Sequence, residues 1–120
     1  MQDFRSLQVW GKGHQLTLAV YKATARASFP KEELYGLPSQ IRRASASIPA
    51  NIAEGGGRSG KAELGRFLQV SMGSASEREY HPLLAHDLGF LRDREYEQLR
   101  SQAVEVKRML SSLIVSLRRR

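Results

Sequence analysis

Apolar residues in the C-terminal part of the chain recur at a spacing that an α-helix places on one side. From residue 96 onward the steps between them alternate between three and four residues, and the positions are Tyr96, Leu99, Ala103, Val106, Leu110, Leu113 and Leu117. With 3.6 residues per turn, these positions form a single stripe with the spacing of a helical-bundle seam. The pattern therefore predicts a long helix packed against other helices, with Asp93 capping its first turn.

Turn-forming residues divide the rest of the chain into three further segments of helical length. Proline and glycine cluster at 29–38 and 55–60, and another break is expected at 89–93, where Gly89 suits the end of a helix. The segments have roughly 18 to 30 residues, which is too long for strands, and short connections favour antiparallel neighbours. The sequence thus predicts one all-α domain over residues 1–120, an antiparallel up-down-up-down four-helix bundle.

Glycines and prolines within these segments are expected to disturb the helices locally. Gly11 and Gly13 should weaken the first helix, because glycine is a poor helix former. Pro82 should bend or break the third segment. Pro49 removes one helical donor and should kink the second helix near Ser45.

The second segment, 37–54, carries a stripe of small side chains beside its apolar face. The apolar face consists of Leu37, Ile41, Ile48 and Ile52. The neighbouring stripe consists of Ala46, Pro49, Ala50 and Ala53. Small side chains let another backbone approach closely, so the stripe predicts an interface with a further packing partner.

The chain carries a positive charge that favours polyanionic partners. Nineteen basic and twelve acidic residues give a net charge of +7, and neutralising phosphates with such cations releases counterions. The candidate nucleic-acid contacts are Arg42, Arg43, Arg58, Lys61, Arg66, Lys107, Arg108, Arg118, Arg119 and Arg120. The alternative is that the C-terminal cations only complement a helix dipole. Trp10 and Tyr21 could stack on bases, but their helical spacing places them in the core.

Recognisable catalytic, metal and cofactor sites are missing from the sequence. The chain has no cysteine, and its three histidines are dispersed and form no Glu-x-x-His element. Residues 55–62 nearly match a phosphate-binding loop, but Ala62 replaces the hydroxyl that binds magnesium, and a helix precedes the loop instead of a strand. We therefore expect no catalytic residue, no metal and no cofactor. Without an apolar leader or a membrane-length run, we expect a cytoplasmic protein that does not bind membranes.

Several motifs together resemble a known bacterial family. They are LQVW (7–10), FPKEELYGL (29–37), SQIRRA (39–44), SIPANIAEG (47–55), Gly73-Ser74, Asp87-Leu88-Gly89 and Met109-Leu110. This pattern is similar to the bacterial four helix bundle proteins first described as encoded within intervening sequences of large-subunit ribosomal RNA genes. The chain departs from the family pattern at Gly11, Gly13 and Pro82, which suggests local distortion of the first and third helices.

The resemblance implies a left-handed four-helix bundle that assembles as a homopentamer, in which the small-residue stripe would contribute to the interface. It also implies nucleic-acid binding through basic surfaces, to RNA or DNA. A relative of similar fold is the accessory variability determinant protein of diversity-generating retroelements, which works with a reverse transcriptase. Two hypotheses follow: a non-enzymatic oligomer that binds nucleic acid, and a structural module that acts with a partner protein.

Overall fold

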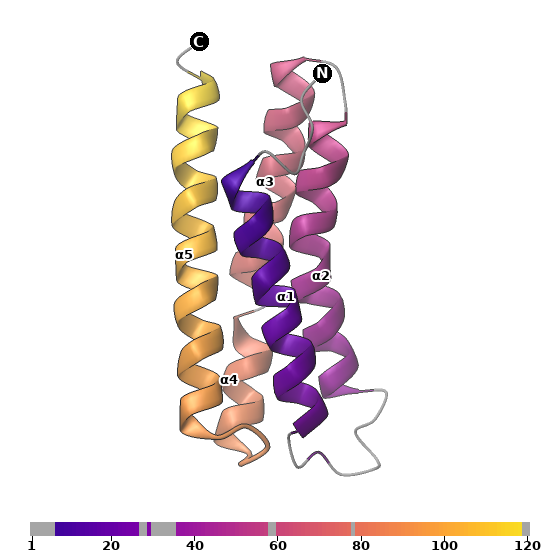
Figure 1. The fold of residues 1–120 in the computed structure, drawn as a ribbon, viewed down its shortest axis with the longest axis vertical. Coiled ribbons are helices and arrows are strands. Elements are labelled where there is room, and N and C mark those ends of the chain that lie inside the picture. Colours follow the sequence, from indigo (N-terminus) through magenta and orange to yellow (C-terminus); the bar gives the residue numbers. More distant parts are fainter. Residues whose placement is uncertain (1–6, 27–28, 30–35, 58–59, 78, 119–120) are drawn as a thin grey trace.

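The computed structural model describes residues 7–26, 29, 36–57, 60–77 and 79–118, and all their regular secondary structure is helical. The helices are α1 (Gln8–Arg26), α2 (Leu37–Gly56), α3 (Lys61–Glu77), α4 (Tyr80–Asp87) and α5 (Asp93–Arg118). Figure 1 shows that α3 and α4 follow each other along one column, so the five helices make four antiparallel columns. The predicted all-α, up-down-up-down four-helix bundle is confirmed.

The apolar seam of α5 packs into the centre of the bundle. α1 contacts α2 and α5, and α3 contacts the same two helices from the other side. Leu99, Val106 and Leu110 are buried, while Ala103 and Leu113 pack against them from partly exposed positions. Ile52 of α2 and Leu68 of α3 are fully buried opposite this seam. The spacing of three and four residues thus identified the core side of the helix.

Pro82 breaks the third segment as predicted. α3 ends at Glu77, and Pro82 lies in the first turn of α4, where a backbone N–H has no partner within the helix. The predicted role of Gly89 at the other end of α4 is also confirmed. Its φ is +82°, its N–H donates to the His86 carbonyl at 2.9 Å, and the next N–H donates to Ala85 at 2.8 Å. This pattern is the Schellman motif, which terminates a helix on a left-handed residue.

In contrast, α2 runs without a break through Pro49. Proline has no N–H to donate to the carbonyl of Ser45, four residues earlier. The hydroxyl of Thr17, on α1, lies 3.1 Å from that carbonyl oxygen and 3.1 Å from the carbonyl oxygen of Gly13. The hydroxyl proton therefore has two acceptors, one of which is the carbonyl that Pro49 leaves without its helical donor.

Gly13 makes this contact between α1 and α2 possible. The residue is buried, and a Cβ atom built on it would lie 3.4 Å from Cγ2 of Ile48 and 3.7 Å from Cβ of Pro49. A longer side chain would collide with α2. The distortion expected at Gly11 and Gly13 does not interrupt the helix, since α1 is continuous from Gln8 to Arg26.

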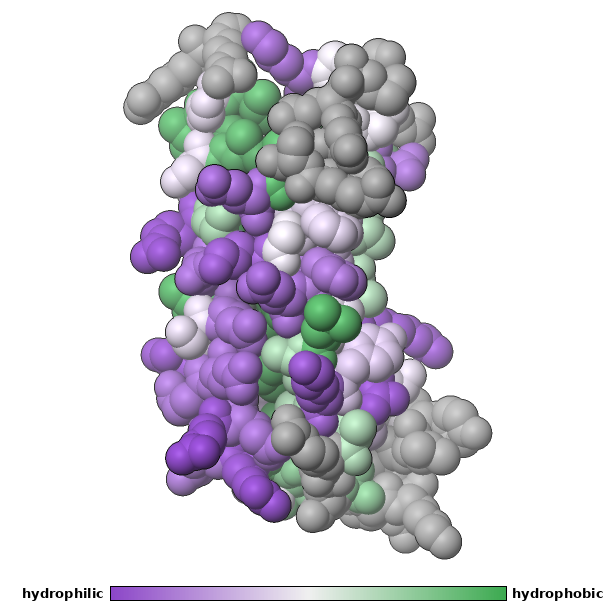
Figure 2. Space-filling model, viewed as in Figure 1, coloured by the Kyte–Doolittle hydropathy of each residue, from purple (hydrophilic) through white to green (hydrophobic). Residues whose placement is uncertain are grey.

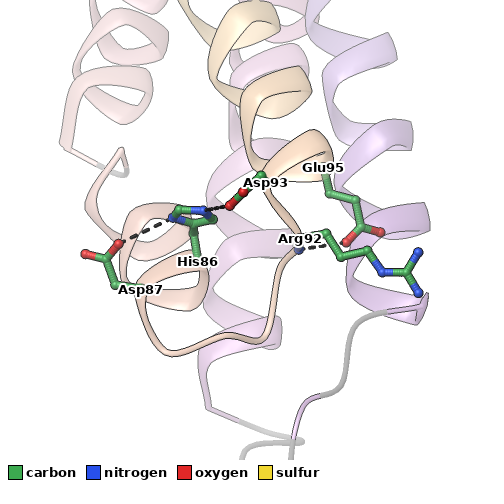
Figure 3. Close-up of polar contacts among 5 residues, drawn as sticks. All are labelled: His86, Asp87, Arg92, Asp93 and Glu95. Atoms are coloured by element: carbon green, nitrogen blue, oxygen red, sulfur yellow. Dashed lines mark hydrogen bonds and ion pairs between the residues drawn. The ribbon is translucent and has the colours of Figure 1, made fainter.

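The capping role predicted for Asp93 is wrong. α5 begins at Asp93, and the backbone N–H of the preceding residue, Arg92, donates to the carboxylate of Glu95 at 3.1 Å. The carboxylate of Asp93 instead contacts Nε2 of His86 on α4 at 2.6 Å (Figure 3). Asp93 therefore ties α4 to α5 across the turn.

Candidate nucleic-acid interface

The cations predicted to bind nucleic acid lie in separate regions of a bundle that is 48 Å long. Arg42 and Arg43 lie in the first half of α2, about 20 Å along the helix from its end at Gly56. Lys61 begins α3 and Arg118 ends α5, and these termini lie at the same end of the bundle (Figure 1). Arg58, Arg119 and Arg120 lie outside the described residues. The seven candidates that the structure describes thus do not form one continuous surface.

The start of α3 and the end of α5 enclose a groove of about 320 Å³, here called the terminal groove. Its lining residues are Lys61, Ala62, Gly65, Arg66, Gln69, Ile114, Leu117 and Arg118. Gly65 leaves part of the wall without a side chain, since a Cβ added there would meet no atom within 4 Å. The groove therefore has a partly open wall and is lined by three cationic side chains from two helices.

The charge in the terminal groove is predominantly positive. Among the described residues, Lys61 and Arg118 have no ion-pair partner, and both are exposed. Arg66 pairs with Glu63, with two nitrogen–oxygen distances of 3.3 Å, and its guanidinium carbon lies 4.5 Å from the centroid of the Phe67 ring. Three cations and one carboxylate leave a local excess of positive charge, which a concave surface concentrates.

The two candidates in the middle of α5 have different surroundings. Lys107 donates to the carboxylate of Glu79 at 2.7 Å, which neutralises much of its charge. Arg108 is exposed and borders a shallow hollow that is also lined by Leu7, Met109 and Leu113. In Figure 2, hydrophobic surface gathers near the beginning of α1 and the end of α5, while most of the remaining visible surface is hydrophilic. Lys107 is therefore a weaker candidate than Lys61 and Arg118, whereas Arg108 is an exposed cation that lies outside the terminal groove.

Arg42 lies against α1. Its Nε donates to the hydroxyl of Thr24 at 2.7 Å, and its guanidinium lies 4.9 Å from the centroid of the Tyr21 ring. The prediction that Tyr21 is a core residue is wrong, since 46% of it is exposed. Trp10 does pack against the core and stacks on His14, with ring centroids 5.0 Å apart. Arg43, one residue along α2, is exposed.

The small-residue stripe on α2 is partly used within the chain. Pro49 is buried and faces Gly13 of α1, so its small size serves an intrachain contact and it is not free for a partner. Ala50 is exposed, and Ala46 and Ala53 are partly exposed. An oligomer interface over these three alanines stays a prediction.

The most perturbed titratable group among the described residues is His86. Its Nε2 contacts Asp93 at 2.6 Å, and its Nδ1 contacts Asp87 at 3.3 Å (Figure 3). The hydrogen bond to Asp93, followed by that to Asp87, raises the pKa of His86 above its ordinary value of 6.5. The imidazole also stacks on Tyr96, with centroids 4.6 Å apart. Its two nitrogens are thus occupied by carboxylates, as expected of a structural contact.

The described part of the chain contains neither a metal-binding cluster nor a membrane-spanning helix. No group of three or more histidine, aspartate or glutamate side chains there is placed to hold a metal ion. No helix there is long and apolar enough to cross a membrane.

The terminal groove could have been foreseen in part, because in an up-down-up-down bundle the third column starts at the end where the fourth finishes.

The fold and the terminal groove define a basic, all-helical four-column bundle. The profile of the 23S rRNA-intervening sequence protein family matches residues 5–112, so the chain belongs to this family. The chain is also similar to a protein of unknown function from the S23 ribosomal protein family of Bacteroides thetaiotaomicron, whose crystal structure is known. The two sequences are 23% identical. The match covers 88% of this chain and 94% of that one, with a TM-score of 0.79, and supports the fold. No curated protein matches the chain significantly.

Proposed function

We propose that the protein binds RNA or DNA without catalysis and that the terminal groove contacts the phosphate backbone. The observation that supports this is the convergence of Lys61, Arg66 and Arg118 from two helices on one groove. Arginine and lysine side chains neutralise phosphates with little dependence on base sequence. The protein is therefore expected to bind many sequences with similar affinity.

The proposal predicts a specific salt dependence. Three phosphate contacts give a slope of about −2 to −3 for the logarithm of the association constant against the logarithm of salt concentration. Raising salt from about 50 to about 200 mM should then weaken binding roughly 15- to 65-fold. Fluorescence anisotropy with a structured RNA, a DNA duplex and a single strand measures the slope for each.

A matched pair of variants separates the groove from the overall charge. The groove variant carries Lys61→Gln, Arg66→Gln and Arg118→Gln. The control carries Arg92→Gln, Arg94→Gln and Arg100→Gln, three exposed arginines near the opposite end of the bundle. Both variants lose three positive charges, so any difference between them reflects the position of the charges. We expect only the groove variant to lose most of its affinity and to show a flatter salt slope. Equal losses in both variants, or no binding by the natural protein at about 50 mM salt, would overturn the proposal.

We also propose that the chain forms a homo-oligomer through Ala46, Ala50 and Ala53. Five copies at +7 each would carry +35, which would strengthen attraction to a polyanion. Ala50 is exposed, so Ala50→Glu should reduce the mass of the assembly without unfolding the chain. Light scattering after size exclusion measures that mass, with Ser111→Glu, on the exposed side of α5, as the control.

The second candidate function is a module that acts with a partner protein. The exposed apolar side chains of Tyr80, Leu83 and Val104 favour it, because they border one opening in the bundle. Capture from the native cell, with and without nuclease, distinguishes the two functions. A protein partner that stays bound after nuclease treatment and is lost in Val104→Glu supports this second function.

A further inference from the structure

A cavity of about 580 Å³ enters the bundle beside the break between α3 and α4. Its buried floor comes mainly from α1 and α2 and consists of Leu16, Val20, Ile41, Ala44, Ser45, Ile48, Ala75 and Leu99. Its exposed mouth lies between the third column and α5 and consists of Ser76, Glu79, Tyr80, Leu83, Arg100 and Val104. The cavity therefore has a mostly apolar interior and an opening where apolar side chains alternate with charged ones.

The size of this cavity follows from the helix break and from small side chains around it. α3 stops at Glu77, and the residues facing the cavity nearby include Ala44, Ala75 and Ala103, which have little volume. Packed protein interiors rarely leave spaces larger than a water molecule. A volume of this size instead falls within the roughly 300 to 1,000 Å³ that is typical of ligand pockets.

The charges at the mouth differ in how far they are neutralised. The Glu79 carboxylate accepts a hydrogen bond from Lys107 at 2.7 Å, so this anion is paired. Arg100 is exposed and forms a long ion pair with Glu97, in which Nη1 lies 3.8 Å from Oε2, beyond hydrogen-bonding distance. Glu97 does not line the cavity. The guanidinium of Arg100 therefore has donors available for an anionic group at the mouth.

We propose that the cavity binds an amphiphile with a flexible aliphatic chain and an anionic head group. The chain lies along the buried apolar floor, and the head group accepts hydrogen bonds from Arg100 at the mouth. This inference is independent of nucleic-acid binding, because the cavity and the terminal groove share no residue.

Calorimetric titration of the full chain with octanoate, decanoate and dodecanoate, below their micellar concentrations, tests the proposal. We expect saturable binding with one site per chain, tightening about fourfold for each added methylene group until the chain fills the cavity. Arg100→Gln should weaken carboxylate binding about tenfold, since it removes a charge-assisted hydrogen bond. Decyltrimethylammonium should bind more weakly than decanoate. Equal affinity for both head groups would overturn the assignment of the anion.

A matched pair of exposed serines tests the location of the site. Ser76→Leu places a larger side chain at the mouth, whereas Ser101→Leu makes the same change at an exposed position of α5 outside the cavity. Only Ser76→Leu should abolish decanoate binding, and both variants should keep the circular dichroism and the nucleic-acid affinity of the natural protein. Unchanged binding in Ser76→Leu, or binding that never saturates and is accompanied by loss of helix, would overturn the proposal.

A second copy of the chain is the other possible occupant of the mouth. Light scattering of the natural protein and of Ser76→Leu detects it as a change in mass. A lower mass in Ser76→Leu, together with no saturable decanoate binding by the natural protein, would show that a neighbouring subunit covers the mouth and would also overturn the proposal.

Discussion

Two columns of the bundle contain a proline, and only one of them breaks. In α2, Pro49 lies inside a continuous helix, and Thr17 of α1 provides a hydroxyl to the carbonyl that the proline leaves without a donor. In the third column, Pro82 starts a separate short helix, and a cavity opens beside the break. The comparison indicates that a helix continues through an internal proline where a neighbouring helix approaches closely enough to satisfy the backbone carbonyl that the proline leaves without a donor, as α1 does for α2.

The largest expected effect tests the close approach. Gly13→Leu should destabilise the fold by about 3 kcal/mol, because the added side chain meets Ile48 and Pro49 and pushes α1 away from α2. Gly11→Leu is the matched control, since a Cβ at that position meets no atom within 4 Å, and it should be neutral or stabilising. Urea unfolding measures both. Equal destabilisation by the two variants would contradict the role given to Gly13.

A smaller effect tests the hydroxyl itself. Thr17→Val keeps the shape of the side chain but removes the donor to the Ser45 carbonyl, which should cost about 1 to 2 kcal/mol. In a Pro49→Ala background, residue 49 has its own N–H, so the cost of Thr17→Val should fall by about 1 kcal/mol. A double-mutant cycle of urea unfolding measures this coupling. A coupling energy near zero would show that Thr17 serves only the Gly13 carbonyl.

Pro82→Ala is expected to change stability less. Pro82 lies in the first turn of α4, where proline costs little, so the free energy of unfolding should change by less than about 1 kcal/mol. Urea unfolding gives this value, and decanoate titration reports whether the cavity survives. A stabilisation of several kcal/mol would mean that Pro82 strains the natural fold.

The smallest effect concerns the contact between His86 of α4 and Asp93 of α5. Because contact with Asp93 raises the pKa of His86 above 6.5, its stabilising contribution is complete below pH 6.5 and disappears as the pH rises through the raised pKa. His86→Gln should therefore lower the melting temperature near pH 5.5 and have less effect near pH 8.5. Asp93→Asn should lower the pKa of His86 toward 6.5, as measured by NMR titration. An unshifted pKa in the natural protein would contradict the contact.

The sequence identified the helices and the break at Pro82 because these depend on residues within a few turns. The seam from Leu99 to Leu110 could be read from its spacing, and Gly89 was recognisable from its position after an apolar segment. The predictions for Asp93 and Tyr21 were wrong because each depends on a neighbouring helix. Asp93 contacts His86 across a turn, and the ring of Tyr21 lies under the guanidinium of Arg42, which belongs to α2.

The candidate site was predicted as a set of cations without an arrangement. Lys61 and Arg118 were named from charge alone, and the packing of α3 beside α5 brings them to one groove with Arg66. The same packing pairs Lys107 with Glu79 and keeps Arg42 against α1. Which cations remain available to phosphates was therefore decided by distances between helices.

The sequence by itself determined that this chain forms amphipathic helices, where they are interrupted, and that its surface is basic. These properties follow from backbone propensity and from the period of the apolar residues, both of which are local. Only the tertiary structure decided which proline is accommodated, which charges converge and where the bundle leaves a cavity. Those outcomes depend on contacts between residues far apart in the chain, whose positions are set when the columns pack.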